Sequence, residues 1–297
     1  MATLREVRNR ISVVKKTQKI TKAMKMVAAA KLRRAQSGVL AARPYAHTIE
    51  ELLRHLVGSV EAGVNPLPTP REGKKVALIV VTSDRGLCGA FNSNLLRAAL
   101  NHIEQKYPGA HEEGRITVFC VGKKGFDFFA KRGYQVGGKY IGVYANLVYS
   151  QAQAIAREVV EAYVKGKADI VEIVYNEFKT MAKVRIVVDQ FLPVPTVQTD
   201  SGGEGAKRPV DYIYEPSTVE IVNALVPRHL NFQIWRILLE SNAAEQGARM
   251  AAMENATENA NEMISHLQLV YNKARQSAIT KELLEVVGGA EALKKTG

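Results

Sequence analysis

The stretch TLREVRNRISVVKKTQKITKAMKMVA, residues 3–28, decides the fold because its pattern is that of one long, paired helix. Thr3 and Glu6 form a capping box, in which each residue satisfies a free backbone N–H of the first turn. Residues in the phase of a coiled-coil seam follow: Leu4, Val7, Ile11 and Val14, and then the polar Gln18 and Thr21. The pattern predicts a helix over residues 1–57, about 80 Å long.

The positive charge of the chain gathers in this helix. The formal net charge is +12, and residues 1–34 contain eleven basic residues and one acidic residue. Three interpretations stay open: a solvated charged face, nucleic-acid binding, or a helix that turns inside an acidic or apolar collar. Residues 1–44 contain no aromatic side chain and no recognised nucleic-acid-binding module, which disfavours the second. Pro44 is expected to kink or break the helix.

A second long helix is predicted at the other end of the chain. Ser217 and Glu220 form another capping box. Pro227 is expected to break off a first short piece, because proline cannot donate the helical hydrogen bond. The main helix would then begin at Arg228 and end at Gly288-Gly289, because glycine favours helix termination.

The apolar residues of this second helix predict a partner helix. Two runs with coiled-coil spacing follow each other with a phase slip, which predicts a stutter. The first run is Leu230, Ile234, Ile237, Ser241, Ala244, Ala248, Ala251 and Asn255, and the second is Ala256, Ala260, Met263, Leu267, Val270, Ala274 and Ser277. We expect the terminal helices to form a long antiparallel coiled coil. Polar seam residues such as Asn255 and Asn259 would weaken its packing, so alanine there should be stabilising.

The pattern changes between the two helices. Residues 58–73 are rich in proline and predict a linker. Short apolar strands alternate with helices over residues 74–214, which predicts a central, Rossmann-like α/β domain with a mainly parallel sheet. The C-terminal helical region takes residues 215–297. The expected strands are 76–82, 116–121, 170–175 and 184–191, and the expected helices are 92–106, 123–131 and 150–164.

One turn of the α/β domain, SDRGLCGAFN at residues 83–92, joins the first strand to the first helix. Glycines at such a place can let backbone N–H groups meet a phosphate. The turn has neither G-x-G-x-x-G nor the G-K-[ST] ending of a nucleoside-triphosphate loop, so a tight turn without a ligand is favoured. The residues expected to be structural in it are Asp84, Arg85, Gly86 and Gly89.

The sequence assigns no catalytic, cofactor or metal site. The six histidines have no metal-binding spacing to another histidine, cysteine or carboxylate, and there is no G-x-S-x-G elbow. Cys88 and Cys120 lack the spacing of a metal or redox pair and are expected to be buried free thiols. No apolar run is long enough to span a membrane, and no signal or transit peptide is expected.

Four longer motifs resemble the γ subunit of F-type ATP synthases. Residues 15–34, including TQKITKAMKMVA, resemble the N-terminal helix of that family, and residues 83–92 resemble its central-domain signature. Residues 240–241 with 248–260, and residues 272–285 with 288–290, are similar to its C-terminal helix. The motifs come in the order of the family and extend from one end of the chain to the other.

The resemblance implies a mechanical role. In this family the paired terminal helices form a shaft inside a hexamer of α and β subunits, and its rotation couples ATP synthesis or hydrolysis to proton or sodium-ion flow. It implies that the α/β domain lies against the ε subunit and the ring of c subunits. The chain would be a non-catalytic, peripheral subunit at the cytoplasmic face of the cell membrane, with no cofactor and no nucleic-acid partner. The lack of a visible transit peptide favours a bacterial source.

The resemblance also implies contacts with moving lever regions of the β subunits. The expected contact residues are Lys15, Lys16, Lys19, Lys22, Met24, Lys25, Met26, Lys273, Arg275 and Gln276. Arg275 and Gln276 are the candidates for hydrogen bonds to a β loop, where an arginine–carboxylate contact would be charge-assisted. The chloroplast branch of the family carries a redox-active cysteine pair in an insert. Cys88 and Cys120 lie elsewhere, so we expect no thiol switching.

Two other functions remain as alternatives at this stage. The first is a basic coiled-coil nucleic-acid-binding protein with an α/β accessory domain, which rests on the charge of the N-terminal helix. The second is a nucleotide-dependent oxidoreductase, which rests only on the alternation of strands and helices.

Overall fold

The computed structural model describes residues 3–57, 67, 75–180, 183–194, 215 and 217–296 of the chain. Nearly all of the expected linker, residues 58–73, lies outside the described residues. The chain divides into two compact units, and both contain parts of the two terminal helices. One unit consists of residues 29–248 and the other of residues 1–28 with residues 249–297. Each unit is described by itself.

The larger unit is built on a five-stranded sheet with the strand order β3-β2-β1-β4-β5. Its strands are β1 (Val76–Val81), β2 (Ile116–Val121), β3 (Gln135–Tyr140), β4 (Ile170–Thr180) and β5 (Lys183–Leu192). The first four are parallel to their neighbours and β5 is antiparallel to β4. The helices between them are α2 (Phe91–Lys106), α3 (Lys123–Ala130) and α4 (Tyr149–Val164). The prediction of a mainly parallel α/β sheet is confirmed.

Strand β3 was not expected from the sequence. Its residues are QVGGKY, and glycine is a poor strand former. The structure gives the reason for both glycines, because the aromatic ring of Phe119 lies across them. A Cβ atom on Gly137 or on Gly138 would come within 2.8 Å of that ring. The two glycines therefore let a bulky side chain of β2 lie over the edge strand. The sequence of β3 consequently lacks the β-branched and aromatic residues that usually indicate a strand.

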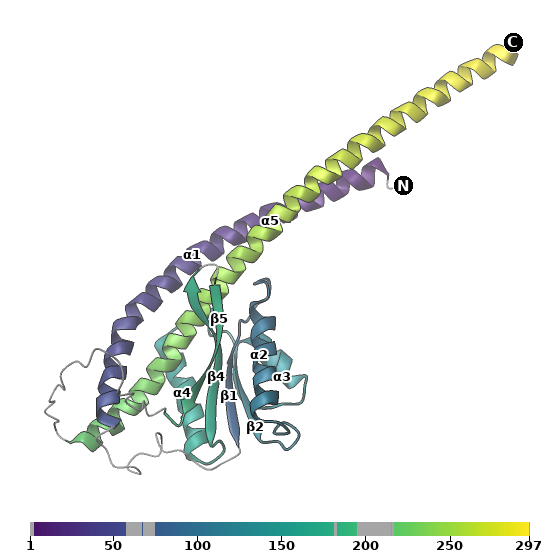
Figure 1. Ribbon diagram of the computed structural model, residues 1–297. Coiled ribbons are helices and arrows are strands. Elements are labelled where there is room, and N and C mark those ends of the chain that lie inside the picture. The colour runs from purple at the N-terminus through teal and green to yellow at the C-terminus, as the bar shows by residue number, and fades with distance from the viewer. Residues whose placement is uncertain are drawn as a thin grey trace, which may run out of the picture. The chain divides into compact units, whose positions relative to one another are not determined.

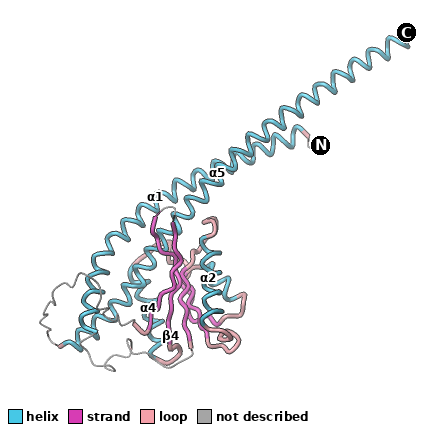
Figure 2. The backbone as a smooth tube through the Cα atoms, viewed as in Figure 1, coloured by secondary structure: helices cyan, strands magenta, loops and turns pink. Residues whose placement is uncertain are grey.

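The two faces of the sheet are covered by different helices (Figures 1 and 2). Ala77, Ile79 and Val81 pack with buried residues of α4 and of the C-terminal helix. Leu78 and Val80, which alternate with them, pack with α2 and α3. All six residues of β1 are buried, as expected for a central parallel strand that is covered on both faces.

Both terminal helices are more continuous than the sequence suggested. Helix α1 runs over Leu4–Val57 without a break at Pro44, and α5 runs over Thr218–Thr296. The breaks expected at Pro227 and at Gly288-Gly289 are therefore wrong. At Pro227 the reason is packing, because Val226 and Leu230 on either side of it are buried. The burial of both flanks outweighs one lost hydrogen bond, which costs roughly 3 kcal/mol.

The smaller unit contains an antiparallel pair formed by the start of α1 and the second half of α5. The amide of Gln18 donates to Asn261 at 2.5 Å, and Lys25 forms an ion pair with Glu254. From the first contact to the second, the residue number rises by seven on α1 and falls by seven on α5, which is the register of an antiparallel pair. Between these contacts the Thr21 and Thr257 hydroxyls lie 2.8 Å apart. The predicted polar seam positions Gln18 and Thr21 are confirmed.

The seam predicted on α5 is partly wrong. Asn255 and Asn259 are exposed, and so are Met263 and Val270. Buried or half-buried residues recur instead every seven positions without a phase slip: Phe232, Leu239, Gln246, Met253, Ala260, Leu267 and Ala274. The expected stutter is therefore absent from the described helix.

The apparent phase slip comes from two different faces of one helix. Leu230, Ile234 and Ile237, from the first predicted run, belong to the core beneath the sheet. In the same unit, residues of the continuous stripe meet α1. Phe232 makes an edge-to-face contact with Tyr45 at 4.6 Å, and a Cβ on Gly38 would lie 3.3 Å from Leu239. The sequence pattern merges these two faces, because both use the same period.

Candidate functional site

The turn at residues 83–92 is held by internal hydrogen bonds. The carboxylate of Asp84 accepts from the backbone N–H of Lys123 at 3.0 Å, and both of its oxygens accept from the N–H of Gly142 at 3.1 Å. These donors belong to the start of α3 and to the loop after β3. Asp84 therefore joins three loops at the carboxyl edge of the parallel sheet.

The neighbouring residues close the same edge. The hydroxyl of Thr82 donates to the carbonyl oxygen of Val121 and accepts from the N–H of Gly125. A side chain at Gly122 would lie 2.2 Å from the carbonyl oxygen of Thr82, so only glycine fits there. Ligands of Rossmann-like folds bind at this edge, with phosphate at a helix N-terminus. In this chain the carboxylate of Asp84 lies at the N-terminus of α3.

The turn also packs against helix α5. Cys88 and Phe91 form a small buried cluster with Ala244 of α5. Leu87 of the same turn has a positive φ of 64° and an exposed side chain. Gly86 and Gly89, expected to be structural, lie on either side of it, and Gly89 also has a positive φ. Arg85 is exposed, and the side chain of Asp84 makes the cross-loop bonds described above.

The two free cysteines are both buried, as expected. Burial raises the pKa of the Cys120 thiol from 9.0 to about 12, which keeps it protonated and unreactive at neutral pH. The part of the chain that the structure describes contains no group of three or more histidine, cysteine or acidic side chains that could hold a metal ion. Over the same residues no helix is long and apolar enough to cross a membrane.

The predicted contact residues of α1 lie in the helical pair of the smaller unit. The side chains of Lys15, Lys16, Lys19, Lys22 and Met26 are exposed. Lys25 differs from them, because its ammonium group is paired with Glu254 of α5, and Met24 is half-buried. Sequence reasoning found the basic face, but the partner of Lys25 depends on the register of the pair.

The three predicted contact residues of α5, Lys273, Arg275 and Gln276, are exposed too. The structure does not bring them to the same level of the pair as Lys15–Met26. The register set by Gln18 with Asn261 and Lys25 with Glu254 places residues 253–264 of α5 opposite Lys15–Met26. Nine or more residues separate Lys273 from that segment, which is roughly 14 Å along the helix. The candidate contacts therefore form two groups.

The end of α5 was missed as a candidate surface. The same register brings residue 275 level with the start of α1, so α5 continues beyond its partner, as Figure 1 shows for this unit. Five large apolar side chains of this segment are between 49% and 70% exposed: Ile279, Leu283, Leu284, Val286 and Val287. Five large apolar residues in one short segment could have indicated a binding surface from the sequence alone. The sequence pattern instead predicted that the helix ends at residue 288.

Together these features define a class of protein. A pair of long helices presents basic and apolar side chains outward, and the α/β domain of the larger unit closes the edge at which such folds bind nucleotides. This is a helical stalk with an accessory domain. A family model described as ATP synthase matches residues 3–293.

Relatives agree with that match. The ATP synthase gamma chain of Chloroherpeton thalassium is 52% identical, with all of both chains covered. That of Chlorobaculum tepidum is 51% identical over 99% of this chain and all of its own length. The chain belongs to the family of ATP synthase gamma chains. The comparisons give no support to the nucleic-acid-binding alternative.

Solved structures share the fold. A chain from the central stalk and c ring of the Tetrahymena thermophila mitochondrial ATP synthase matches with a TM-score of 0.60 at 26% identity, over 80% of this chain and 99% of that one. A chain from the Euglena gracilis mitochondrial ATP synthase matches with a TM-score of 0.68 at 23% identity, over 98% of this chain and 94% of that one. The second likeness concerns the fold alone.

Proposed function

We propose that this chain is the central rotor shaft of an F-type ATP synthase. It turns inside a ring of α and β subunits and couples ion flow through a c ring to conformational change at the catalytic β subunits. The chain itself is a non-catalytic subunit, without a cofactor, on which the activity of the complex depends.

One observation supports this role above the others: α5 continues beyond α1 and exposes Ile279, Leu283, Leu284, Val286 and Val287. Exposed apolar side chains of this size mark a binding surface, because burying each contributes roughly 1.5–3 kcal/mol. Four of the five, Ile279, Leu283, Val286 and Val287, have the i, i+4, i+7, i+8 spacing of one helical face. An apolar surface on the inside of a ring of subunits would cover this face.

The basic residues of the helical pair would supply the contacts that depend on the state of the catalytic β subunits. We assign Lys15, Lys16, Lys19, Lys22 and Met26 to contacts with β subunits, with Lys273, Arg275 and Gln276 as a second group at a different level. A contact biases one catalytic site only by its difference in affinity between two states, about 1–3 kcal/mol. Lys25 and Met24 are weaker candidates, since Lys25 is already paired with Glu254.

The α/β domain would carry the remaining partners. We assign to it the contacts with the ε subunit and with the ring of c subunits. The chain would then be peripheral at the cytoplasmic face of the cell membrane and would reach the membrane only through that ring.

The first experiment compares ATP hydrolysis by cognate α and β subunits purified with and without this chain. We expect the three chains to co-purify and sustained turnover to require this chain. A chain that neither joins the complex nor changes turnover would refute the rotor role.

Two variants then separate the surfaces. The double variant Leu283→Asp/Leu284→Asp should abolish co-purification without changing the unfolding of the isolated chain, because both side chains are exposed there. Arg275→Ala should leave assembly intact and lower turnover several-fold. Lys131→Ala, at an exposed position of the α/β domain, is the control.

A further inference from the structure

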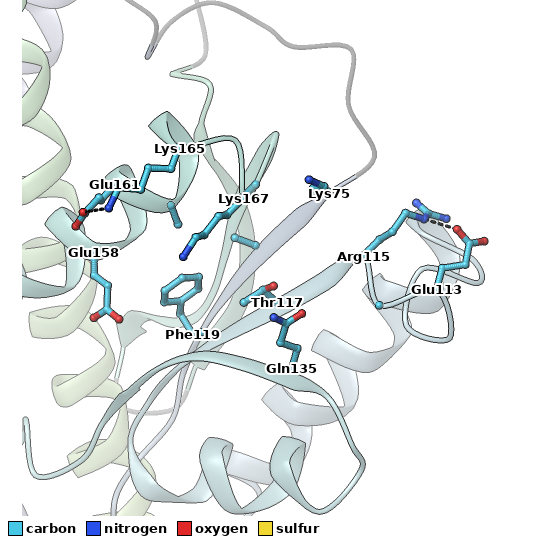
Figure 3. A pocket seen from close by; sticks show the side chains of 15 residues that line it. Lys75, Glu113, Arg115, Thr117, Phe119, Gln135, Glu158, Glu161, Lys165 and Lys167 are labelled. Carbon is cyan, nitrogen blue, oxygen red and sulfur yellow. Dashed lines mark hydrogen bonds and ion pairs between the residues drawn. The ribbon is translucent and has the colours of Figure 1, made fainter.

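A groove of about 660 Å³ opens on the α/β domain at the amino ends of the parallel strands, opposite the edge closed by Asp84 (Figure 3). Its floor is formed by Ala77 of β1, Thr117 and Phe119 of β2, and Gly137 of β3. One wall is the last part of α4, with Glu158, Glu161 and Lys165.

The charges around the groove do not cancel. Glu161 is paired with Lys165, Glu113 is paired with Arg115, and Glu158 accepts a hydrogen bond from the Tyr140 hydroxyl. Glu161 and Glu113 are thus balanced by bases of the lining, whereas Glu158 keeps its negative charge beside a neutral hydroxyl.

Two ammonium groups are left over. The Nζ atom of Lys75 donates to the carbonyl oxygen of Gly166. Figure 3 shows the side chain of Lys167 extending over the groove toward Phe119. Among the described residues, neither Lys75 nor Lys167 has a carboxylate within ion-pair distance. The lining contains four basic and three acidic side chains, so the groove carries a net charge of +1.

The strand that bounds the groove favours an extended peptide as the occupant. β3 is the end strand of the sheet, so the outer backbone N–H and C=O groups of β3 have no strand beside them in the described fold. Such an edge pairs readily with an added strand. Gly137 of this strand is part of the floor of the groove, where Thr117 and Phe119 fill the space that a side chain would take. A small anion would use the lysines but not the edge.

We propose that this groove binds an extended, acidic segment of a partner subunit. The segment would lie along the edge of β3 and place a carboxylate near Lys75 and Lys167. The proposal rests on the chain being assembled with partner subunits, and it concerns a surface separate from the helical pair. A nucleotide is disfavoured, because Rossmann-like folds bind such ligands at the opposite edge of the sheet.

Zero-length cross-linking of the complete complex with a carbodiimide tests the proposal, because the reagent joins an ammonium group only to a carboxylate that touches it. We expect Lys167 or Lys75 to be linked to an aspartate or glutamate of a partner subunit. Lys131, which is exposed on α3's side of the domain, is the matched lysine and should remain unlinked. Acetylation of Lys75 and Lys167 should also be at least fivefold slower in the complex than in the isolated chain.

A charge-reversed pair gives the second readout. Lys75→Glu/Lys167→Glu should weaken retention of the linked subunit at least tenfold, whereas Lys131→Glu should not. Retention of α and β, with their ATP turnover, is scored separately, so failure of the rotor role and failure of the groove are distinguishable. Unchanged acetylation with no cross-link would overturn the proposal. So would slower acetylation of the isolated chain on vesicles of anionic phospholipid, with no cross-link in the complex, since it would make the occupant a membrane.

Discussion

The α/β domain and the helical pair differ in how far each satisfies its own apolar residues. In the domain, Ile79, Phe129 and Val174 are completely buried, and alternate residues of the central strands reach two separate cores. In the helical pair, Val13, Ile20 and Met26 are each more than half exposed. The domain thus carries its own stability, whereas the surface of the pair is shaped for neighbours. The predictions below test this difference, beginning with the largest effect.

The largest difference in stability is expected between a substitution in the core of the α/β domain and one on the surface of the helical pair. Ile79→Ala removes a fully buried side chain from the central strand and should lower the free energy of unfolding by about 4 kcal/mol, through lost transfer energy and a cavity. Ile20→Ala is the matched change in the helical pair, where the side chain is exposed, and should cost less than about 0.5 kcal/mol. Urea unfolding of the isolated chain measures both. Equal losses would show that the pair has a core of its own.

The second effect concerns the closed edge of the sheet. Asp84→Ala leaves the backbone N–H groups of Lys123 and Gly142 without their acceptor, so we expect a loss of about 2–3 kcal/mol. Glu112→Ala, at an exposed position of the same domain, is the control and should have little effect. Thermal unfolding decides between them. A silent Asp84 variant would mean that the carboxylate does not hold the three loops together.

Alkaline pH should weaken the domain through Cys120. Burial raises the pKa of its thiol from 9.0 to about 12, so its contribution is complete below pH 9 and is lost as pH rises toward 12. Between pH 8 and pH 10 this thiol alone should remove about 1.4 kcal/mol. Burial also raises the pKa of the Tyr144 hydroxyl, which adds a further loss above pH 10. Denaturant unfolding at both pH values measures the slope, and Cys120→Ala should flatten it.

How much of this was readable from the sequence depends on how each segment is packed. The runs at Val76–Val81 and Ile116–Val121 are buried on both faces, and an uninterrupted apolar pattern is the direct result. Strand β3 was not predicted from the sequence, because its two glycines carry no side chains and Phe119 of β2 fills the space above them. The continuity of α5 through Pro227 is decided by the tertiary burial of Val226 and Leu230, which local propensity does not contain.

The candidate site shows the same division. The exposure of Lys15, Lys19 and Arg275 follows from helical periodicity, because each lies off the seam. The pairing of Lys25 with Glu254 joins residues 229 positions apart, and only the register of the pair brings them together. That register also separates Lys273 from the basic residues of α1, which the resemblance alone does not reveal.

A substitution in the turn at residues 83–92 should increase the stability of the domain, by less than the losses described above. Leu87 holds a left-handed φ of 64° with its side chain in solvent, so the strain is not offset by burial. Leu87→Gly should therefore raise the free energy of unfolding by up to about 1 kcal/mol, the gain being reduced by the greater freedom of unfolded glycine. Leu87→Ala keeps the strain and should change nothing. A destabilised glycine variant would show that the leucine side chain makes a contact.

The smallest effect tests the phase of the seam. If Asn255 and Asn259 lay in it, alanine would improve its packing; both are instead exposed. Each substitution should then stabilise by about half a kcal/mol, since alanine is the better helix former. Asn9→Ala, at an exposed position of α1 in the same unit, should give a similar gain for the same reason. Helical melting followed by circular dichroism compares the three. A gain at Asn255 and Asn259 well above that at Asn9 would put them back between the helices and overturn the seven-residue stripe through Met253, Ala260 and Leu267.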